Sequence, residues 1–359
     1  MDLTVCVCTH NRPGYLRDCL AGLRRQTAGQ NRFTVLIVDS GSSSAARAEL
    51  RELAEGHAGA RLIRVDAPGV SAARNAGAAA STTGYIAYID DDAVPAEDWV
   101  ASILAVLAVP GGHSGHDAHA GLLPGAPRST GQLPIGLPPA GCPAVLGGRV
   151  LPRWEAPLPA WWPPSLRGVL SIIEHEGQGE FRTAALPKGL EPYACNMIVH
   201  VPALLAAGGF GTGIGRVGTA LLSDEEVQLA WRLQDAGMSA RYDSRIVVFH
   251  QIQARRLNPG WLLSRLYWQG ASTVLTRRLL RAPASVWREL PRRLVITVLF
   301  APFALWPRSS PRCLAPRWRW AYAAGFVRAA LGWRATEAAR QIGTAAPASA
   351  SLDSARSAP

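Results

Sequence analysis

Apolar, strand-like segments alternate with helical patterns through the first 110 residues, and this alternation constrains the fold more than any other feature. Leucines at helical spacing follow the first apolar run, and helices are also expected at 71–80 and from 95 to 109. The apolar runs, typical of strands buried on both faces, occupy residues 3–9, 33–39, 62–65 and 85–89. Strands that alternate with helices predict a mostly parallel sheet flanked by helices.

Polar residues stand at the carboxyl ends of three predicted strands. Thr9 ends the first, Asp39 ends the second, and the run 90–92 of three aspartates follows the fourth. In open parallel sheets ligands bind at this edge. Three adjacent carboxylates repel one another unless a cation compensates, and such oxygen ligands suit Mg²⁺ or Mn²⁺ together with substrate phosphates. A solvated acidic turn is the alternative interpretation of the three aspartates alone.

Arg74 lies near the start of the helix expected at 71–80. A helix amino terminus with an arginine can hold a diphosphate through backbone N–H groups and bidentate contacts. This position, between two strands that end in acids, suits a nucleotide site.

The second half of the chain adds a candidate base and a candidate metal ligand. Strands are expected at 193–199 and 246–249, the latter ending at His250, and a helix at 225–235. Glu225 and Glu226 in the first turn of this helix are candidates for a general base, and an imidazole at a strand end can bind a metal. Ordinary helix-dipole pairing of the acids and a buried core histidine are the alternatives.

Together these segments resemble the glycosyltransferases of family 2. The resemblance extends from residue 3 to about 252. It is carried by the segments 9–12, 38–42, 73–77, 88–92 and 223–226 and by Asn196, Arg232, Gly237 and His250. It implies the Rossmann-like A-type glycosyltransferase fold, with a nucleotide half joined to an acceptor half. It also implies an inverting, metal-dependent transfer from a nucleotide-diphosphate sugar to an acceptor hydroxyl.

The resemblance also implies roles for individual residues. Asp39 would contact the base of the nucleotide, and Asp90 and Asp92 match the two acids of the DxD motif, with Asp92 the first candidate for the metal and Asp90 nearer the ribose. Glu226 stands where the family has its aspartate base, with Glu225 as the alternative. The full prediction for the donor site is Thr9, Asn11, Arg12, Asp39, Arg74, Asn75, Asp90 and Asp91, and for the metal Asp92, Asp90 and His250.

The acceptor region is predicted from fewer signals. Asn196 belongs to the resemblance, whereas Trp161 and Trp162 are candidates because adjacent indoles can stack on a sugar. Packing beneath a proline-rich turn is the alternative for the two tryptophans.

The charge is divided unevenly along the chain. The total is +11, but residues 255–359 contain 17 arginines and three acids, a net charge of +14, while residues 1–254 carry −3. The longest apolar run of this part, 294–306, is shorter than the roughly 20 residues that span a bilayer. We expect an anionic membrane surface as the partner, with a helical appendage as the alternative. Nucleic acid ranks last because no known reading module is present.

These patterns divide the chain into three predicted parts. Residues 1–254 form the catalytic part, with a nucleotide half at 1–109, a mobile insertion at 110–142 and an acceptor half at 143–254. A basic, Arg/Trp-rich helical region follows at 255–342, and a disordered tail at 343–359.

The sequence also predicts where the protein is located and leaves two other functions open. No targeting leader is visible and the cysteines form no CxxC pair, which predicts a cytoplasmic protein at the inner face of the membrane. A nucleotidyltransferase of similar fold and a non-catalytic protein that binds nucleotide sugars at a membrane remain open alternatives.

Overall fold

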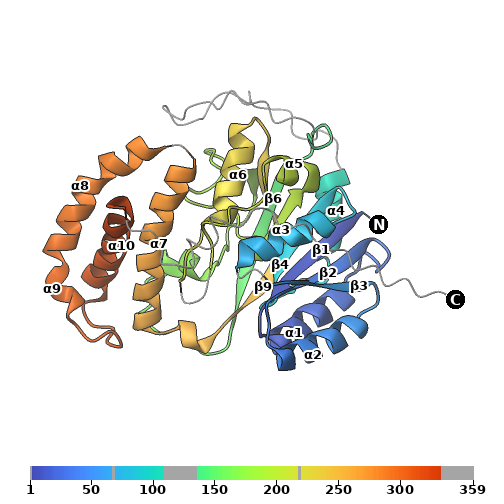
Figure 1. The fold of residues 1–359 in the computed structure, drawn as a ribbon, viewed down its shortest axis with the longest axis horizontal. Helices are drawn as coiled ribbons and strands as arrows, with labels where there is room; N and C mark the ends of the chain where they lie inside the picture. Colours follow the sequence, from blue (N-terminus) through green and yellow to red (C-terminus); the bar gives the residue numbers. More distant parts are fainter. Residues whose placement is uncertain (1, 67–68, 109–135, 217–219, 281, 333–359) are drawn as a thin grey trace.

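A nine-stranded sheet forms the centre of the fold (Figure 1). The structure is a computed structural model that describes residues 2–66, 69–108, 136–216, 220–280 and 282–332. Its strand order is β3-β2-β1-β4-β8-β6-β9-β5, and β7 pairs with β9. The strands are β1 (Leu3–Thr9), β2 (Phe33–Ser40), β3 (Ala60–Val65), β4 (Tyr85–Asp90), β5 (Ala93–Pro95), β6 (Val145–Trp154), β7 (Gln178–Glu180), β8 (Met197–His200) and β9 (Ala240–Ile252).

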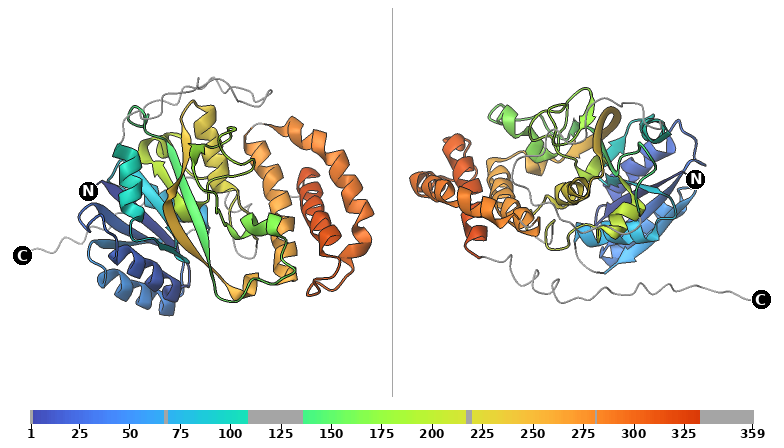
Figure 2. Two further views of the ribbon diagram at one scale, coloured as in Figure 1. Left: turned by 180° about the vertical axis from the view of Figure 1, so that it is seen from behind. Right: turned by 90° about the horizontal axis from the view of Figure 1, so that it is seen from above.

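The first half of the sheet is parallel, as predicted. Strand β1 pairs in parallel with β2 and β4, and β2 with β3. The connecting helices α1 (Pro13–Arg24) and α2 (Ser44–Glu55) lie on one face of the sheet, and α3 (Val70–Ala80) lies on the other (Figures 1 and 2). The continuous apolar runs are buried because helices cover both faces. Helix α2 was not predicted from the sequence.

The second half of the sheet is mixed. Strand β8 is antiparallel to β4 and β6, β5 is antiparallel to β9, and β6 is parallel to β9. The segment predicted as a strand at 193–199 begins instead with a 3₁₀ turn, Ala194–Asn196, and becomes β8 only at Met197. Strand β9 is longer than predicted, so His250 lies within it and stands opposite Ala93.

Helices cover this half as well. The helix predicted from residue 95 begins at Trp99, because β5 precedes it. The helix predicted at 225–235 has those bounds. The helices are α4 (Trp99–Ala108), α5 (Val201–Ala206) and α6 (Glu225–Asp235).

Residues beyond β9 form a helical layer beside the sheet (Figure 1). Helix α10 packs between α7 and α8. At its crossing with α7, a Cβ at Gly270 or Gly325 would overlap the partner's backbone, so glycine permits the close approach. No helix among the described residues is long and apolar enough to cross a membrane. The helices are α7 (Pro259–Leu279), α8 (Pro283–Leu299), α9 (Ala301–Ala304) and α10 (Leu314–Ala330).

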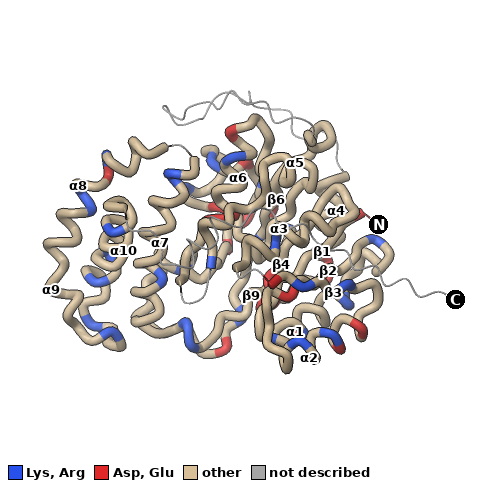
Figure 3. Tube along the Cα trace, viewed as in Figure 1, with Lys and Arg blue, Asp and Glu red and all other residues tan. Residues whose placement is uncertain are grey.

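The predicted insertion at 110–142 lies outside the described residues except for 136–142, and so does the predicted tail at 343–359. Within the described part, acidic residues gather where β1, β4 and α6 meet, and arginines are spread along α7, α8 and α10 (Figure 3).

Candidate active site

The polar strand ends lie side by side at one edge of the sheet. Thr9 of β1 stands opposite Asp39 of β2, and Cys8 stands opposite Asp90 of β4. Because these strands are parallel, their carboxyl ends open on the same side, where ligands bind in sheets of this kind. The structure thus brings together residues that are up to 82 positions apart, as in the hydrogen bond from Thr9 to Asp91.

Asp39 is buried but keeps one carboxylate oxygen free. Its Oδ1 accepts a hydrogen bond from the backbone N–H of Ser42 at 2.9 Å. Its Oδ2 has no hydrogen-bond partner among the described residues, and the Arg64 guanidinium lies 3.9 Å away. A buried acceptor without a donor is costly, so a ligand that offers an N–H group here is stabilised. A nucleobase offers such a group.

Asp91 is fully buried, and its carboxylate is held by two other predicted residues. Thr9 donates its hydroxyl to Asp91 at 2.8 Å, and Arg12 forms an ion pair with it. Burial, opposed by the charge of Arg12, raises the pKa of Asp91 to about 7. In this structure Asp91 lies beneath the site, where it holds Thr9 and Arg12. None of its side chain is exposed for the donor contact predicted from the sequence.

Two predicted asparagines join loops at the border of the site. Asn11 has a positive φ of 54° and accepts a hydrogen bond from the backbone of Ser43 at 2.8 Å. Asn75 donates to the carbonyl of Phe210 at 3.0 Å and accepts from its N–H at 2.7 Å. Both side chains therefore hold neighbouring loops in place around the carboxyl ends of the parallel strands.

Arg74 connects the nucleotide half to helix α6. It is buried, and it donates to Glu225 at 2.7 Å and to Asp90 at 3.3 Å. Burial alone lowers the pKa of Arg74, but the two carboxylates outweigh it and raise the pKa above its usual value. The guanidinium stays charged and orders carboxylates from two separate elements.

Asp92 is the most heavily bonded carboxylate of the site. Its Oδ2 accepts from Arg12 at 2.7 Å, Arg256 at 3.0 Å and Gln253 at 3.1 Å. Burial raises its pKa, but His250 and the two arginines outweigh this and hold the pKa of Asp92 well below its usual value. Sequence reasoning missed Gln253 and Arg256, which had been counted with the basic region or left without a role.

Asp92 and His250 also present two groups that fit a divalent metal. The Nδ1 of His250 lies 3.0 Å from the carbonyl of Leu170, which orients the ring so that Nε2 faces Asp92 Oδ1 at 3.5 Å and the Arg256 guanidinium at 3.4 Å. A metal on Nε2 would replace this contact with Arg256. A hydrogen bond at the far nitrogen is the usual support of a metal-binding imidazole. Among the described residues no three His, Cys, Asp or Glu side chains gather around one point, so substrate phosphates and water would complete the shell. Asp90 points instead toward Arg74.

The two glutamates of α6 differ in their partners. Glu225 pairs through Oε1 with Arg74 at 2.7 Å, and its Oε2 has no hydrogen-bond partner among the described residues. Glu226 has a carboxylate oxygen, Oε2, without a hydrogen-bond partner among the described residues. Burial and the neighbouring charge of Glu225 raise the pKa of Glu226 to about 8, a value suited to a general base near neutral pH.

Helix α7 supports the start of α6, a contact that the sequence did not predict. Asp224, with a φ of 79°, accepts two hydrogen bonds from Gln269 at 2.9 and 3.0 Å. Arg265 donates to Ser223 at 3.1 Å, while its Nε and Nη1 have no hydrogen-bond partner in the described part of the chain. These residues place the glutamates and leave buried donors beside them.

The side chains predicted for the acceptor region contact other residues of the protein. The Asn196 side chain accepts from the indole of Trp99 at 2.9 Å and donates to the carbonyls of Arg149 and Ile246 at 2.8 and 2.9 Å. Trp161 and Trp162 stack on each other with ring centroids 5.5 Å apart, and Trp162 also contacts Trp261 of α7, with centroids 6.5 Å apart. Asn196 therefore joins α4 to strands β6 and β9, whereas Trp161 and Trp162 pack against the helical layer at α7.

Comparisons with known proteins concern the family and the fold of the chain. Residues 4–112 match the family model described as Glycosyl transferase family 2. Those residues contain β1 to β4 and therefore every strand end described above except that of β9.

Two curated relatives carry glycosyltransferase names. One is the pre-mycofactocin glycosyltransferase of Mycobacterium tuberculosis, 25% identical over 266 residues, which are 73% of this chain and 46% of the relative. The other is the glucosyl-dolichyl phosphate glucuronosyltransferase of Haloferax volcanii, 25% identical over 205 residues, 57% of this chain and 54% of the relative. The chain thus spans about half the length of these relatives.

A solved structure shares the fold. It is the mannosyltransferase PcManGT from Pyrobaculum calidifontis in complex with GDP-Man and Mn²⁺, with a TM-score of 0.54 and 17% identity, covering 91% of this chain and 86% of that one. The predicted A-type glycosyltransferase fold is therefore confirmed. With the family match and the named relatives, it leads to one conclusion: residues 4–112 are a glycosyltransferase family 2 domain.

Proposed function

We propose that this protein is an inverting glycosyltransferase that moves a sugar from a nucleotide-diphosphate donor to an acceptor hydroxyl. One observation carries the proposal: the unpaired carboxylate oxygen of Glu226 lies next to Glu225, which Arg74 joins to Asp90 at the nucleotide edge. The candidate base thus adjoins, in the chain, an ion-pair network that reaches the candidate donor site.

The donor class follows from the chemistry of the strand ends. Asp39 offers a free buried oxygen to a base N–H, and Asp90, with 32% of its side chain exposed, can accept from a ribose hydroxyl. Arg12 and Arg256 lie at Asp92 and supply positive charge for a diphosphate. The presence of GDP-Man in the PcManGT structure supports a donor of this class.

Asp92 and His250 would hold the divalent metal, Mn²⁺ or Mg²⁺, that this site fits. A bound metal offsets negative charge on the leaving diphosphate. The PcManGT complex with Mn²⁺ supports its use in this fold.

Glu226 acts as the base in this proposal. Its free carboxylate oxygen takes the proton of the acceptor hydroxyl. The acceptor oxygen then attacks the anomeric carbon from the face opposite the diphosphate. The new carbon–oxygen bond forms as the bond to the diphosphate breaks, and the nucleoside diphosphate leaves with the electron pair. A single displacement of this kind inverts the configuration at that carbon.

The acceptor is a hydroxyl of a lipid-linked, glycan or small-molecule substrate. A lipid-linked acceptor is supported by the name of the Haloferax relative, which acts on a glucosyl-dolichyl phosphate. We place the activity at the cytoplasmic face of a membrane, because all six cysteines are free, as is usual in a reducing compartment.

A thermal-shift screen of nucleoside diphosphates and nucleotide sugars, with and without Mn²⁺, tests the proposal. A ligand at a hundred times its Kd stabilises the folded protein by about 2.7 kcal/mol, and we expect one nucleotide sugar to raise the melting temperature and then to be consumed with a suitable hydroxyl acceptor. Consumption of a nucleoside triphosphate with release of pyrophosphate would instead identify a nucleotidyltransferase. Binding without any turnover would identify a non-catalytic nucleotide-sugar-binding protein.

A further inference from the structure

Helices α8 and α9 form the outermost layer of the molecule, away from the sheet (Figure 1). The inner face of α8 is anchored: Val286 and Leu290 are buried with residues of α7 and α10. Arg293 on the same face lies 4.5 Å over the ring of Tyr322 and pairs with Glu289. The orientation of α8 is therefore fixed, and its other face points away from the protein.

That outer face is apolar and exposed. Seven of the twelve most exposed large apolar side chains among the described residues fall between positions 287 and 306. Val298 is 71% exposed and Leu305 is 89% exposed. Contiguous exposed apolar surface marks an interaction site. We call this surface the apolar stripe: Trp287, Leu294, Val295, Val298, Leu299, Leu305 and Trp306.

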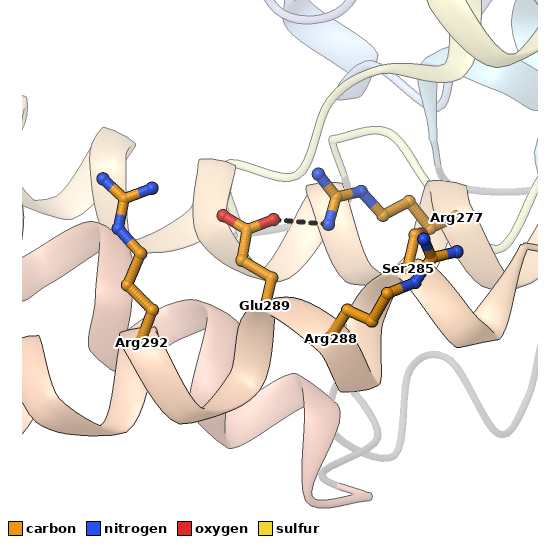
Figure 4. A pocket seen from close by; sticks show the side chains of 5 residues that line it. All are labelled: Arg277, Ser285, Arg288, Glu289 and Arg292. Atoms are coloured by element: carbon orange, nitrogen blue, oxygen red, sulfur yellow. Dashed lines mark hydrogen bonds and ion pairs between the residues drawn. The ribbon is translucent and has the colours of Figure 1, made fainter. Parts of the chain in front are cut away.

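An arginine-lined pocket borders the apolar stripe. It lies between α7 and α8, has a volume of about 410 Å³, and is lined by Arg277, Ser285, Arg288, Glu289 and Arg292 (Figure 4). Glu289 is neutralised by Arg277 at 2.6 Å and by Arg293. Arg288 and Arg292 have no carboxylate within 4.0 Å among the described residues. Arg288 and Arg292, one helical turn apart on α8 and on either side of the neutralised Glu289 (Figure 4), can bind an anion such as phosphate.

We propose that α8 and α9 lie in the surface of an anionic membrane, with the apolar stripe among the acyl chains and a lipid phosphate in the arginine pocket. Charge favours this occupant over a second copy of the chain, because residues 255–359 carry a net charge of +14 and would repel themselves. The combination of exposed Trp, Leu and Val with flanking arginines is that of a helix lying in a membrane interface, and each basic residue near an anionic surface contributes about 1 kcal/mol.

The placement connects this surface to the candidate active site. Arg277 of the pocket and Arg265 beside the glutamates both belong to α7 and are twelve residues apart, about 18 Å along a helix. A membrane on α8 therefore lies near the acceptor side of the site. The inference does not depend on the chemistry proposed there, and either proposal can fail alone.

Vesicle flotation with the full chain tests the inference. The vesicles contain phosphatidylcholine alone or with 30 mol% phosphatidylglycerol. We expect binding to the anionic vesicles only. The double variant Arg288→Ser/Arg292→Ser should weaken it about 30-fold, the equivalent of two basic residues at about 1 kcal/mol each. The matched control Arg51→Ser/Arg61→Ser removes the same charge from exposed positions of the nucleotide half and should bind like the wild type.

A second variant tests the apolar stripe. Val298→Ser/Leu299→Ser replaces two exposed side chains, so it should fold, which circular dichroism checks, and should lose the part of vesicle binding that resists 0.5 M salt. Equal weakening by the control pair would overturn the inference in favour of unspecific charge. A wild-type dimer in light scattering that the stripe variant makes monomeric would overturn it in favour of self-association. A donor thermal shift that persists in every variant shows that any failure concerns the membrane surface alone.

Discussion

Arginines at the strand ends and arginines on α8 have opposite surroundings. Arg74 is buried between Glu225 and Asp90, and Arg256 is buried against Asp92. Arg288 and Arg292 are exposed, lie beside exposed apolar side chains, and have no carboxylate partner among the described residues. The first set orders a site inside the protein, whereas the second set is available to an anion outside it. The net charge of +11 therefore includes two sets of arginines with different surroundings.

The largest expected effect comes from Asp92, which pairs with the buried Arg256 and with the half-buried Arg12. Asp92→Asn leaves Arg256 without a carboxylate partner and leaves Arg12 with Asp91 alone, and breaking a buried pair in this way costs about 3–5 kcal/mol. We expect the free energy of unfolding, measured by urea denaturation, to fall by this amount and metal-dependent turnover to be lost.

The control is Asp2→Asn, at an ion pair with Arg32 in which both side chains are about half exposed, 47% and 49%. Exposed pairs contribute about 0–1 kcal/mol. Similar losses in the two variants would contradict the distinction between buried and exposed charges.

Glu226→Gln should be the second largest effect. Removing a general base lowers the rate by about 10²–10⁴, while donor affinity stays within about twofold because the strand ends are unchanged. With the wild type, kcat/KM should rise with pH and level off above the pKa of about 8 for Glu226, since only the deprotonated carboxylate accepts a proton. A flat profile from pH 6 to 9 would argue against Glu226 as the base.

The same residue predicts a pH-dependent stability difference. The pKa of Glu226 is raised from 4.5 to about 8 in the folded protein, so between these values the folded state binds more protons and the free energy of unfolding falls as pH rises. Glu226→Gln has no proton to lose. Its melting temperature relative to the wild type should increase from pH 5 to pH 8.5, and a constant difference would be inconsistent with a buried, protonated Glu226.

Gln269→Ala should have a smaller effect. It removes both side-chain donors that Gln269 gives to Asp224, and a buried group left without its partner costs about 1–3 kcal/mol. We expect a loss of this size in denaturation and a several-fold lower kcat with little change in the KM for the donor. Gln269→Glu keeps the length of the side chain but adds a negative charge next to Asp224. Its stability and kcat should be no higher than those of Gln269→Ala.

The smallest effect is expected on α8. Arg292→Ser should change the free energy of unfolding by less than about 0.5 kcal/mol, as is usual for exposed positions. A loss above 1 kcal/mol would mean that the arginine pocket supports the fold rather than a ligand.

Much of the nucleotide half could be predicted from the sequence, because its signals are local. Strands buried on both faces are continuous apolar runs, and β1 has the predicted bounds 3–9. Helix α6 begins with two acids and is followed by Gly237, so both of its ends were recognisable. Helix α2 was missed, although Ser43 is its amino-terminal cap.

The second half depends on contacts that a single sequence does not contain. Strand β8 pairs antiparallel with β4 and β6. These partners are far from β8 in the sequence, so tertiary packing decides the pairing. Gln253 and Arg256 reach Asp92 from 161 and 164 positions away. Counting charge over residues 255–359 hid Arg256 and Arg265 among arginines that face outward.

The most direct test of the two separate functions is one experiment on two variants, in which nucleoside diphosphate release and flotation with anionic vesicles are measured for the same preparations. Glu226→Gln should lose at least about 100-fold in release and float like the wild type. Arg288→Ser/Arg292→Ser should release nucleoside diphosphate at the wild-type rate without vesicles and bind the anionic vesicles about 30-fold more weakly. If either variant loses both properties, the candidate active site and the arginines of α8 do not serve separate functions.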